Sequence, residues 1–173
     1  MGLAYDKGTA FSVRERMLFM GNDFKMIFAQ AQEIIQAEPW YISALSNISA
    51  LLMENMTELN WAGFYLNRNG RLTVGPFQGK PACIHISFGK GVCGKAAESD
   101  KTIVVPDVHD YPGHIACDAA SMSEIVIPIH FQKNVVGVLD LDSPVLNRFS
   151  EEDAAELESL VQMIEAETEW PIL

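Results

Sequence analysis

The hydrophobic period of the chain changes twice, and this limits the folds that it can adopt. Between residues 24 and 52, apolar side chains recur every three to four positions, as on one face of a helix. From Trp61 to Leu66 the side chains alternate between two faces, as in a strand. Helical spacing returns after Ser150. This order predicts one α+β domain with its helices gathered on one side of a sheet.

Capping and turn residues indicate where these elements begin and end. A cap at Asn22 or Asp23 opens a helix that runs to about Ala37, and a second helix follows Trp40. Asn69-Gly70 is a strong hairpin signal, so residues 71–77 should pair back antiparallel. The other expected elements are strands at 83–87, 102–106, 124–130 and 134–141, a turn and short helix at 89–99, and a helix opened by Ser150 and Asp153.

Composition and charge exclude several classes of protein. The chain is 49% apolar, which excludes disorder, and no apolar run reaches the roughly 18 residues of a membrane span. The start of the chain lacks the charged and apolar regions of a signal peptide, so we expect a cytoplasmic protein. The net charge is −11, from 23 acidic and 12 basic residues, and such a surface repels nucleic acid.

One of three cysteines lies in a long polar loop, expected at residues 107–122. Loops of this length in compact domains are usually functional, and the segment is too polar to bury Cys117 as a structural thiol. An imidazolium at His114, or amides at a helix start, would lower the pKa of this thiol, whereas Asp118 would raise it. The loop setting favours chemistry at Cys117.

The other two cysteines have competing interpretations. Cys93 fits a small core residue on the short helix, and Cys83 begins a predicted strand, where burial and chemistry are equally compatible with the spacing. A zinc site is the main alternative, because the three cysteines with His85, His109 and His114 offer enough ligands for tetrahedral coordination. The spacing resembles no compact zinc motif, so we expect no metal.

Three carboxylates are expected to meet at one end of the last hairpin. Asp140 and Asp142 project from the same face of their strand, and Glu124 and Asp142 lie equally far from the bend at 132–134. Clustered carboxylates cannot all ionise freely, so at least one pKa should rise, and that acid could donate a proton at neutral pH. A solvated acidic edge is the ordinary alternative in so acidic a chain.

Two aromatic residues, Trp61 and Tyr65, share one face of their strand. Core packing is the default interpretation of both. They would form an aromatic wall for a small apolar group only if that face meets the loop that carries Cys117.

Several long segments resemble the free methionine-R-sulfoxide reductases, a family of single GAF-domain enzymes. The segments span most of residues 60–153 and read NWAGFYL, GPFQGKPAC, FGKGVCG, DVHDYPGHIACDAASMSEIV, GVLDLDSP and RFSEED. The resemblance implies one GAF domain over residues 1–173, with its core at about 24–166. It implies a central antiparallel sheet with the N- and C-terminal helices on one side and a loop-rich ligand pocket on the other.

The resemblance also implies a role for each candidate residue. Cys117 would be the catalytic nucleophile, Cys83 the resolving thiol and Cys93 an auxiliary resolving thiol. The residues that would line the substrate pocket are Trp61, Tyr65, Glu124, Asp140 and Asp142. The implied protein is a homodimer that reduces free methionine-R-sulfoxide without a cofactor and is recycled by thioredoxin.

The residue types fit this chemistry. A thiolate at Cys117 attacks the sulfur of the sulfoxide, and Glu124 or Asp142 could protonate the departing oxygen. A sulfenic acid then condenses readily with Cys83. The remaining carboxylates would hold the free amino group, and the turn at Gly89–Gly94 is a candidate for the substrate carboxylate.

A non-catalytic GAF-type sensor of a small ligand or of redox state is the rival interpretation, since fold does not fix function. A sensor is ordinarily joined to an output domain, for which we expect 173 residues to leave no room.

Overall fold

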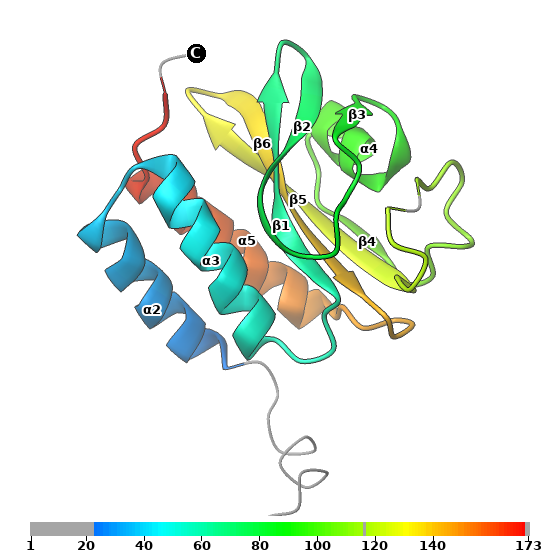
Figure 1. Cartoon of the computed structure of the whole chain (residues 1–173), viewed down its shortest axis with the longest axis horizontal. Coiled ribbons are helices and arrows are strands. Elements are labelled where there is room, and N and C mark those ends of the chain that lie inside the picture. Colours follow the sequence, from blue (N-terminus) through cyan, green and yellow to red (C-terminus); the bar gives the residue numbers. More distant parts are fainter. Residues whose placement is uncertain (1–22, 116, 172–173) are drawn as a thin grey trace, which may run out of the picture.

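The computed structural model describes residues 23–115 and 117–171. An antiparallel sheet of six strands forms the centre of this part of the chain. The strand order across the sheet is β3-β2-β1-β6-β5-β4 (Figure 1). The strands are β1 (Trp61–Arg68), β2 (Arg71–Gly79), β3 (His85–Ser87), β4 (Ile103–Val105), β5 (Ser123–Phe131) and β6 (Asn134–Ser143). The candidate carboxylates therefore lie on neighbouring strands, because β6, with Asp140 and Asp142, pairs with β1 on one side and with β5, which carries Glu124, on the other.

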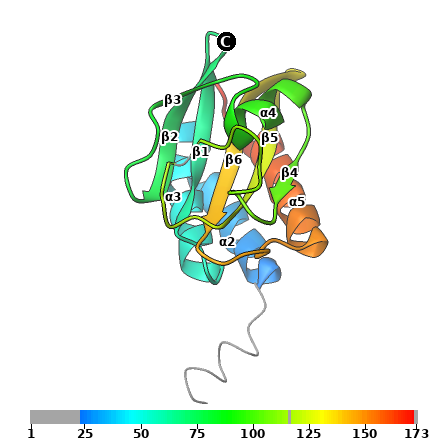
Figure 2. The ribbon, with the colours of Figure 1, turned by 90° about the vertical axis from the view of Figure 1, so that its right-hand side faces the viewer.

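Helices cover the two faces of the sheet unequally. The helices on one face are α2 (Phe24–Ala37), α3 (Tyr41–Asn55) and α5 (Glu151–Glu167). The shorter α4 (Gly91–Ser99) lies on the opposite face, together with the loop that follows β4 (Figures 1 and 2). This arrangement confirms the predicted α+β layout. Within the described residues, every helix is too short or too polar to cross a bilayer.

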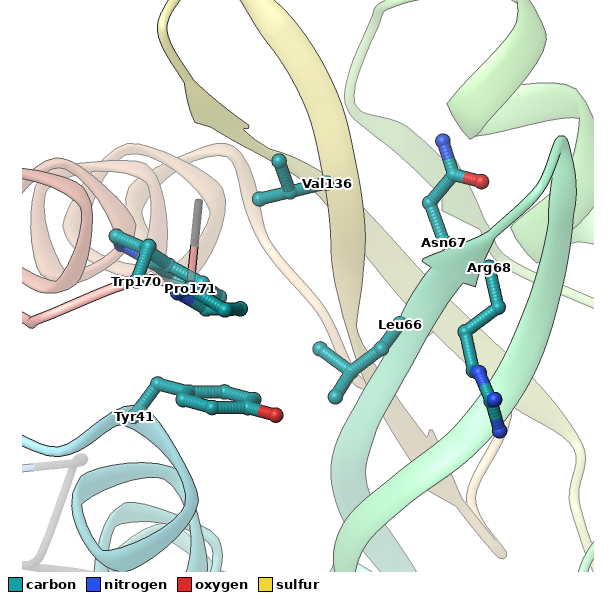
Figure 3. A pocket seen from close by; sticks show the side chains of 7 residues that line it. All are labelled: Tyr41, Leu66, Asn67, Arg68, Val136, Trp170 and Pro171. Atoms are coloured by element: carbon teal, nitrogen blue, oxygen red, sulfur yellow. The ribbon is translucent and has the colours of Figure 1, made fainter. Parts of the chain in front are cut away.

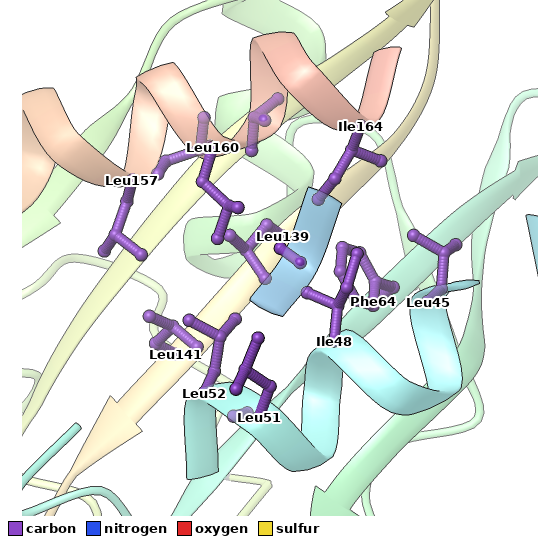
Figure 4. Close-up of a cluster of buried hydrophobic side chains, with 14 of the residues drawn as sticks. Leu45, Ile48, Leu51, Leu52, Phe64, Leu139, Leu141, Leu157, Leu160 and Ile164 are labelled. Atoms are coloured by element: carbon purple, nitrogen blue, oxygen red, sulfur yellow. The ribbon is translucent and has the colours of Figure 1, made fainter. Parts of the chain in front are cut away.

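The alternation of side chains along β1 divides the apolar core in two. Phe64 faces the three-helix side and packs with Leu139 and Leu141 among the side chains of α3 and α5 (Figure 4). Trp61 and Tyr65 face the other side, where α4 contributes to a second apolar cluster. The predicted period of two therefore separates a purely structural face from the face that carries the candidate site.

Local signals fixed most element boundaries correctly. The helix predicted to end near Ala37 does so, and Asp23 caps its start by accepting a hydrogen bond from the backbone of Met26 at 3.1 Å. The capping box at the start of α5 is present, with Ser150 and Asp153 each accepting from the backbone of the other at 3.0 Å.

One element prediction was wrong. Cys83 does not begin a strand, because β3 starts only at His85. The carbonyl oxygen of Cys83 accepts a hydrogen bond from the hydroxyl of Tyr65 at 3.0 Å. In a strand this carbonyl would accept from the backbone N–H of a neighbouring strand. Here it accepts from a side chain instead, and Cys83 lies in a loop.

Candidate active site

Two of the three cysteines meet on the face of the sheet opposite α2, α3 and α5. Cys83 and Cys117 form a disulfide across 34 positions of sequence, with their Cα atoms 5.5 Å apart. This separation is ordinary for a disulfide. Cys117 lies in the predicted long loop, named here the cysteine loop (residues 107–115 and 117–122). The fold therefore places the candidate nucleophile and its candidate partner in bonding contact.

The aromatic pair lies directly beneath this disulfide. The hydroxyl of Tyr65 binds the carbonyl of Cys83 and lies 4.0 Å from the sulfur of Cys117. The indole of Trp61 stacks on Tyr65 with ring centroids 5.8 Å apart, and its N–H donates to the carbonyl of Lys80 at 3.2 Å. Both rings are buried. The condition set for an aromatic wall, that this face should meet the cysteine loop, is thus met.

Asp118 anchors the cysteine loop to the rest of the domain. Its carboxylate accepts hydrogen bonds from the backbone of Ala120 at 2.9 Å, from Asn60 at 3.3 Å and from Lys80 at 3.2 Å. The N–H of Ala120 and the ammonium of Lys80 lower the pKa of this carboxyl. Asn60 also donates to Ser121 at 3.0 Å. Sequence reasoning missed Asn60 and Lys80, because nothing local links them to a residue some 40 to 60 positions away.

Three carboxylates line a small cavity beside the disulfide. The pairing of β5 with β6 sets Glu124 opposite Asp142, and Asp140 lies two residues along the same face. Glu124 is only 5% exposed and Asp140 only 6%. The cavity measures about 20 Å³ and also reaches Cys117. The predicted convergence is therefore present, and the alternative of a solvated acidic edge is wrong.

Burial makes these carboxyl groups hold their protons unusually well. It raises the pKa of Glu124 and of Asp142 well above the ordinary range, and mutual repulsion with Asp140 raises both further. Burial raises the pKa of Asp140 to about 7. At neutral pH the cluster therefore contains protonated acid, which is the form that a general acid needs.

Cys93 belongs to the same cavity. It lies in the first turn of α4, is 3% exposed, and its sulfur is 3.8 Å from a carboxyl oxygen of Glu124. Burial raises the pKa of this thiol well above its ordinary value. The prediction of a buried helix position is confirmed, but the sulfur packs against acids as well as against the apolar cluster.

The expected imidazolium near Cys117 is not supported. His114 lies with Nε2 3.6 Å from a carboxyl oxygen of Glu124, and burial lowers the pKa of the imidazole. Burial thus disfavours the charged form of both groups in this contact. His114 can donate or accept a hydrogen bond at the cavity, but it does not supply a positive charge.

The zinc site considered from the sequence is not assembled. His85 binds the hydroxyl of Thr73 at 3.3 Å on the exposed strand β3, and His109 binds Asp107 at 2.9 Å. Two of the three cysteines are consumed by the disulfide. The alternative of a zinc site built from the three cysteines and three histidines is therefore not supported.

The start of α4 opens onto the cavity, as the glycine-rich sequence suggested. Gly91, Val92 and Cys93 all line it, and no side chain caps this helix at Lys90. The backbone N–H groups of a first helical turn have no partner within the helix. They are therefore suited to bind an anionic group that enters the cavity.

A larger pocket lies elsewhere but lacks reactive groups. It measures about 220 Å³ and opens between the helix layer and the far ends of β1 and β6 (Figure 3). Its walls are mainly aromatic and aliphatic, from Tyr41, Leu66, Val136, Trp170 and Pro171. Its lining contains neither a cysteine nor a carboxylate, so the smaller cavity at the disulfide is the candidate active site.

Removing the buried charge from the cluster should change how stability depends on pH. Below about pH 4, Asp140 is protonated in both the folded and the unfolded chain. Between about pH 4 and its folded pKa of about 7, only the folded chain keeps this proton. Stability from this group is thus lost as the pH rises, by at most about 4 kcal/mol. In urea unfolding of the oxidised protein, we expect lower stability at pH 8 than at pH 5, and Asp140→Asn should reduce that difference.

The exposed Asp110 in the cysteine loop provides the matched control. Asp110→Asn should leave the difference between pH 5 and pH 8 unchanged. Wild-type stability that rises over this range, or a difference that Asp140→Asn leaves intact, would contradict a proton held in the folded state.

Comparison with known proteins supports a common family. The GAF domain family matches residues 43–166. The free methionine-R-sulfoxide reductase of Escherichia coli is 48% identical over 132 residues, which is 76% of this chain and 80% of that protein.

Solved structures agree with the sequence comparison. The structure of fRMsr of Staphylococcus aureus in complex with substrate superposes with a TM-score of 0.82 at 47% identity, covering 86% of this chain and 97% of that one. Free methionine-R-sulfoxide reductase from Neisseria meningitidis, in complex with its substrate, gives a TM-score of 0.80 at 37% identity, covering 91% and 93%.

Proposed function

Because this chain belongs to the free methionine-R-sulfoxide reductase family of GAF-domain proteins, we propose that it reduces free methionine-R-sulfoxide to methionine at the cavity beside Cys117. One observation carries the assignment to this site. A disulfide between Cys83 and Cys117 borders a cavity with three carboxylates, at least two of them almost fully buried. Redox-active sulfur and a proton source are thus combined in one place.

The carboxylates explain why the substrate would be the free amino acid. Asp140 has one carboxyl oxygen that is buried and without a hydrogen-bond partner among the described residues. A substrate ammonium would satisfy it and would neutralise the cluster. Methionine sulfoxide within a peptide has no such ammonium, so it would leave the buried oxygen unpaired.

The start of α4 would hold the other end of the substrate. Gly91 and Val92 of its first turn line the cavity, where N–H groups have no partner within the helix, and a substrate carboxylate there would also gain from the helix dipole. With the ammonium at Asp140, the amino acid would be bound at both charged groups. The methyl end of the side chain would then rest against the ring of Trp61, close to Cys117.

The chemical step needs one sulfur nucleophile and one acid. The thiolate of Cys117 attacks the sulfur of the sulfoxide and forms a sulfur–sulfur bond, while Glu124 or Asp142 donates a proton to the oxygen. The resulting hydroxyl group then moves from the substrate sulfur to the sulfur of Cys117 as the sulfur–sulfur bond breaks, so Cys117 becomes a sulfenic acid and methionine departs. The thiol of Cys83 then displaces water from the sulfenic acid and forms the disulfide seen here.

Recycling requires an external dithiol, and thioredoxin is the proposed donor. Exchange at the disulfide would return two electrons and two protons to Cys83 and Cys117. The present cavity of about 20 Å³ has room for about one water molecule and not for an amino acid. We therefore infer that the cysteine loop moves outward once the disulfide is reduced.

The experiment that tests the function supplies the reduced protein with free methionine-R-sulfoxide and a thioredoxin system. We expect many turnovers of methionine per protein molecule, with much lower rates for the S epimer and for peptide-bound sulfoxide. A pure sensor would bind its ligand or oxidise once and then stop. Product limited to one equivalent would therefore favour the sensor interpretation.

Cys83→Ser should separate the chemical step from recycling. Without the resolving thiol, the first turnover should still produce about one equivalent of methionine, because Cys117 is intact. Later turnovers with thioredoxin should slow by at least about tenfold, because the sulfenic acid has lost its partner. The measurement is a rapid-quench time course of methionine.

The double variant Cys83→Ser/Cys93→Ser tests the auxiliary thiol. Cys93 lines the same cavity as Cys117, so slow residual cycling in the single variant should disappear in the double variant. Loss of the first-turnover burst in Cys83→Ser would instead show that this cysteine acts in the chemical step.

A further inference from the structure

The fold gathers three donor atoms of the kind that bind metal ions, in a combination that the proposed reaction does not use. The sulfur of Cys93 and one carboxyl oxygen each of Glu124 and Asp140 all lie within 4.8 Å of one another, and all three residues are buried. This set differs from the histidine-based site considered from the sequence. It is the one group of three such donors among the residues that the structure describes.

The spacing of these donors matches a single small ion. Zinc bonds to thiolate sulfur at about 2.3 Å and to carboxylate oxygen at about 2.0–2.2 Å, so two such ligands in a tetrahedron stand about 3.6 Å apart. The sulfur of Cys93 and Oε1 of Glu124 are 3.8 Å apart. This pair is therefore close to the separation that a shared ion requires, and the carboxyl oxygen of Asp140 lies within 4.8 Å of both atoms.

An independent observation indicates that the spot is built for a ligand. Oδ1 of Asp140 is buried without a hydrogen-bond partner in the described part of the chain, and the residue is only 6% exposed. An unpaired buried carboxyl oxygen is costly, so it marks a place where a cationic group fits. A substrate ammonium would use this oxygen but would not need the neighbouring sulfur.

Further ligands are within reach. Nε2 of His114 lies 3.6 Å from the second oxygen of Glu124, and an imidazole nitrogen is the commonest metal ligand in proteins. The adjoining cavity has room for about one water molecule. Three protein donors with a histidine or water in the fourth position is a common zinc arrangement.

We propose that Cys93, Glu124 and Asp140 form a binding site for a thiophilic divalent cation of the zinc type. The ion and the substrate exclude one another, because both require the carboxyl groups of Asp140 and Glu124. Zinc is thus an inhibitor that acts inside the candidate active site. The binding of the ion stands by itself, and only its effect on catalysis rests on the proposed function.

The disulfide makes the binding test specific. In the oxidised protein Cys83 and Cys117 are bonded to each other, so Cys93 is the only free thiol of the three cysteines. Titration of this form with Co²⁺ should give one bound ion with a sulfur-to-metal charge-transfer absorption, which Zn²⁺ then displaces. Any such band in the oxidised protein reports on Cys93.

Variants test each ligand. Cys93→Ser should abolish the charge-transfer band, and Cys93→Ser and Asp140→Asn should each weaken Zn²⁺ binding by about tenfold or more. His85→Ala is the matched control, because this exposed histidine lies on β3 outside the donor set. The affinity of this variant for Zn²⁺ should equal that of the wild type. Circular dichroism of each oxidised variant checks its fold.

The outcomes separate the two parts of the proposal. Wild-type protein without a stoichiometric sulfur-to-cobalt band, or a band that survives in Cys93→Ser, overturns the site. Zn²⁺ should raise the KM for free methionine-R-sulfoxide at least about tenfold in the wild type, reversibly with chelator, and much less in Cys93→Ser. If Zn²⁺ binds but the KM does not rise, the competition between ion and substrate is overturned and the site stands. If Zn²⁺ binds and the protein has no reductase activity, the proposed function is refuted instead.

Discussion

Cys117→Ser should lower single-turnover formation of methionine by about 10³-fold or more. A serine hydroxyl stays protonated at neutral pH and is a poor nucleophile toward sulfur, whereas a thiolate is intrinsically reactive. Removal of a nucleophile commonly leaves only the acceleration that binding and polar groups provide. The measurement uses fully reduced protein in molar excess over the substrate and omits thioredoxin, so that recycling cannot limit the amount of methionine formed.

The control for this variant is substrate binding. Serine is close in size to cysteine, so the reduced variant should still bind free methionine-R-sulfoxide with a similar dissociation constant by calorimetry. If methionine still forms at a comparable rate, the nucleophile is another thiol. Cys93 would be the candidate, because it lines the same cavity.

Glu124→Gln should produce the second largest loss, about 10²–10³-fold in kcat/KM. Burial and the neighbouring carboxylates keep Glu124 protonated, so it can deliver a proton where an ordinary glutamate would be ionised. The amide has nearly the same shape but no acidic proton. If Glu124 is the donor, the loss should fall mainly on kcat, measured in steady state with saturating reductant.

Asp142→Asn provides the matched comparison. Asp142 pairs with Glu124 across the hairpin and is also held in its protonated form, so the two acids compete for the same role. The variant with the larger loss in kcat identifies the donor, and the one that mainly raises KM identifies a carboxyl group that helps Asp140 to hold the substrate ammonium. Unchanged kcat in both variants would contradict proton donation from this cluster.

Local sequence signals predicted much of the candidate site because they act over short distances. Glu124 and Asp142 are paired by the hairpin, and a tight bend at Gln132 and Lys133, both with positive φ, makes that pairing readable from a count along the chain. The alternation along β1 likewise identified Trp61 and Tyr65 as one face. These predictions depend on periodicity and turn chemistry, which a single chain displays directly.

Other features depend on contacts that no local pattern encodes. The anchoring of Asp118 by Asn60 and Lys80 joins three separate segments of the chain. The neutral state of His114 depends on its burial, and sequence alone had suggested a charged imidazolium. Cys83 was assigned to a strand because its neighbours favour one, but the hydroxyl of Tyr65 takes its carbonyl.

The amino-acid sequence by itself determined the α+β order, the last hairpin and the loop that carries Cys117, because period, caps and turn residues act between near neighbours. Only the tertiary structure decided that Cys117 meets Cys83, that Cys93 lies against Glu124, and that these acids keep their protons. The physical reason is burial. Reactivity at this site comes from the removal of water around groups from distant segments, and that exclusion exists only once the sheet, α4 and the cysteine loop have packed together.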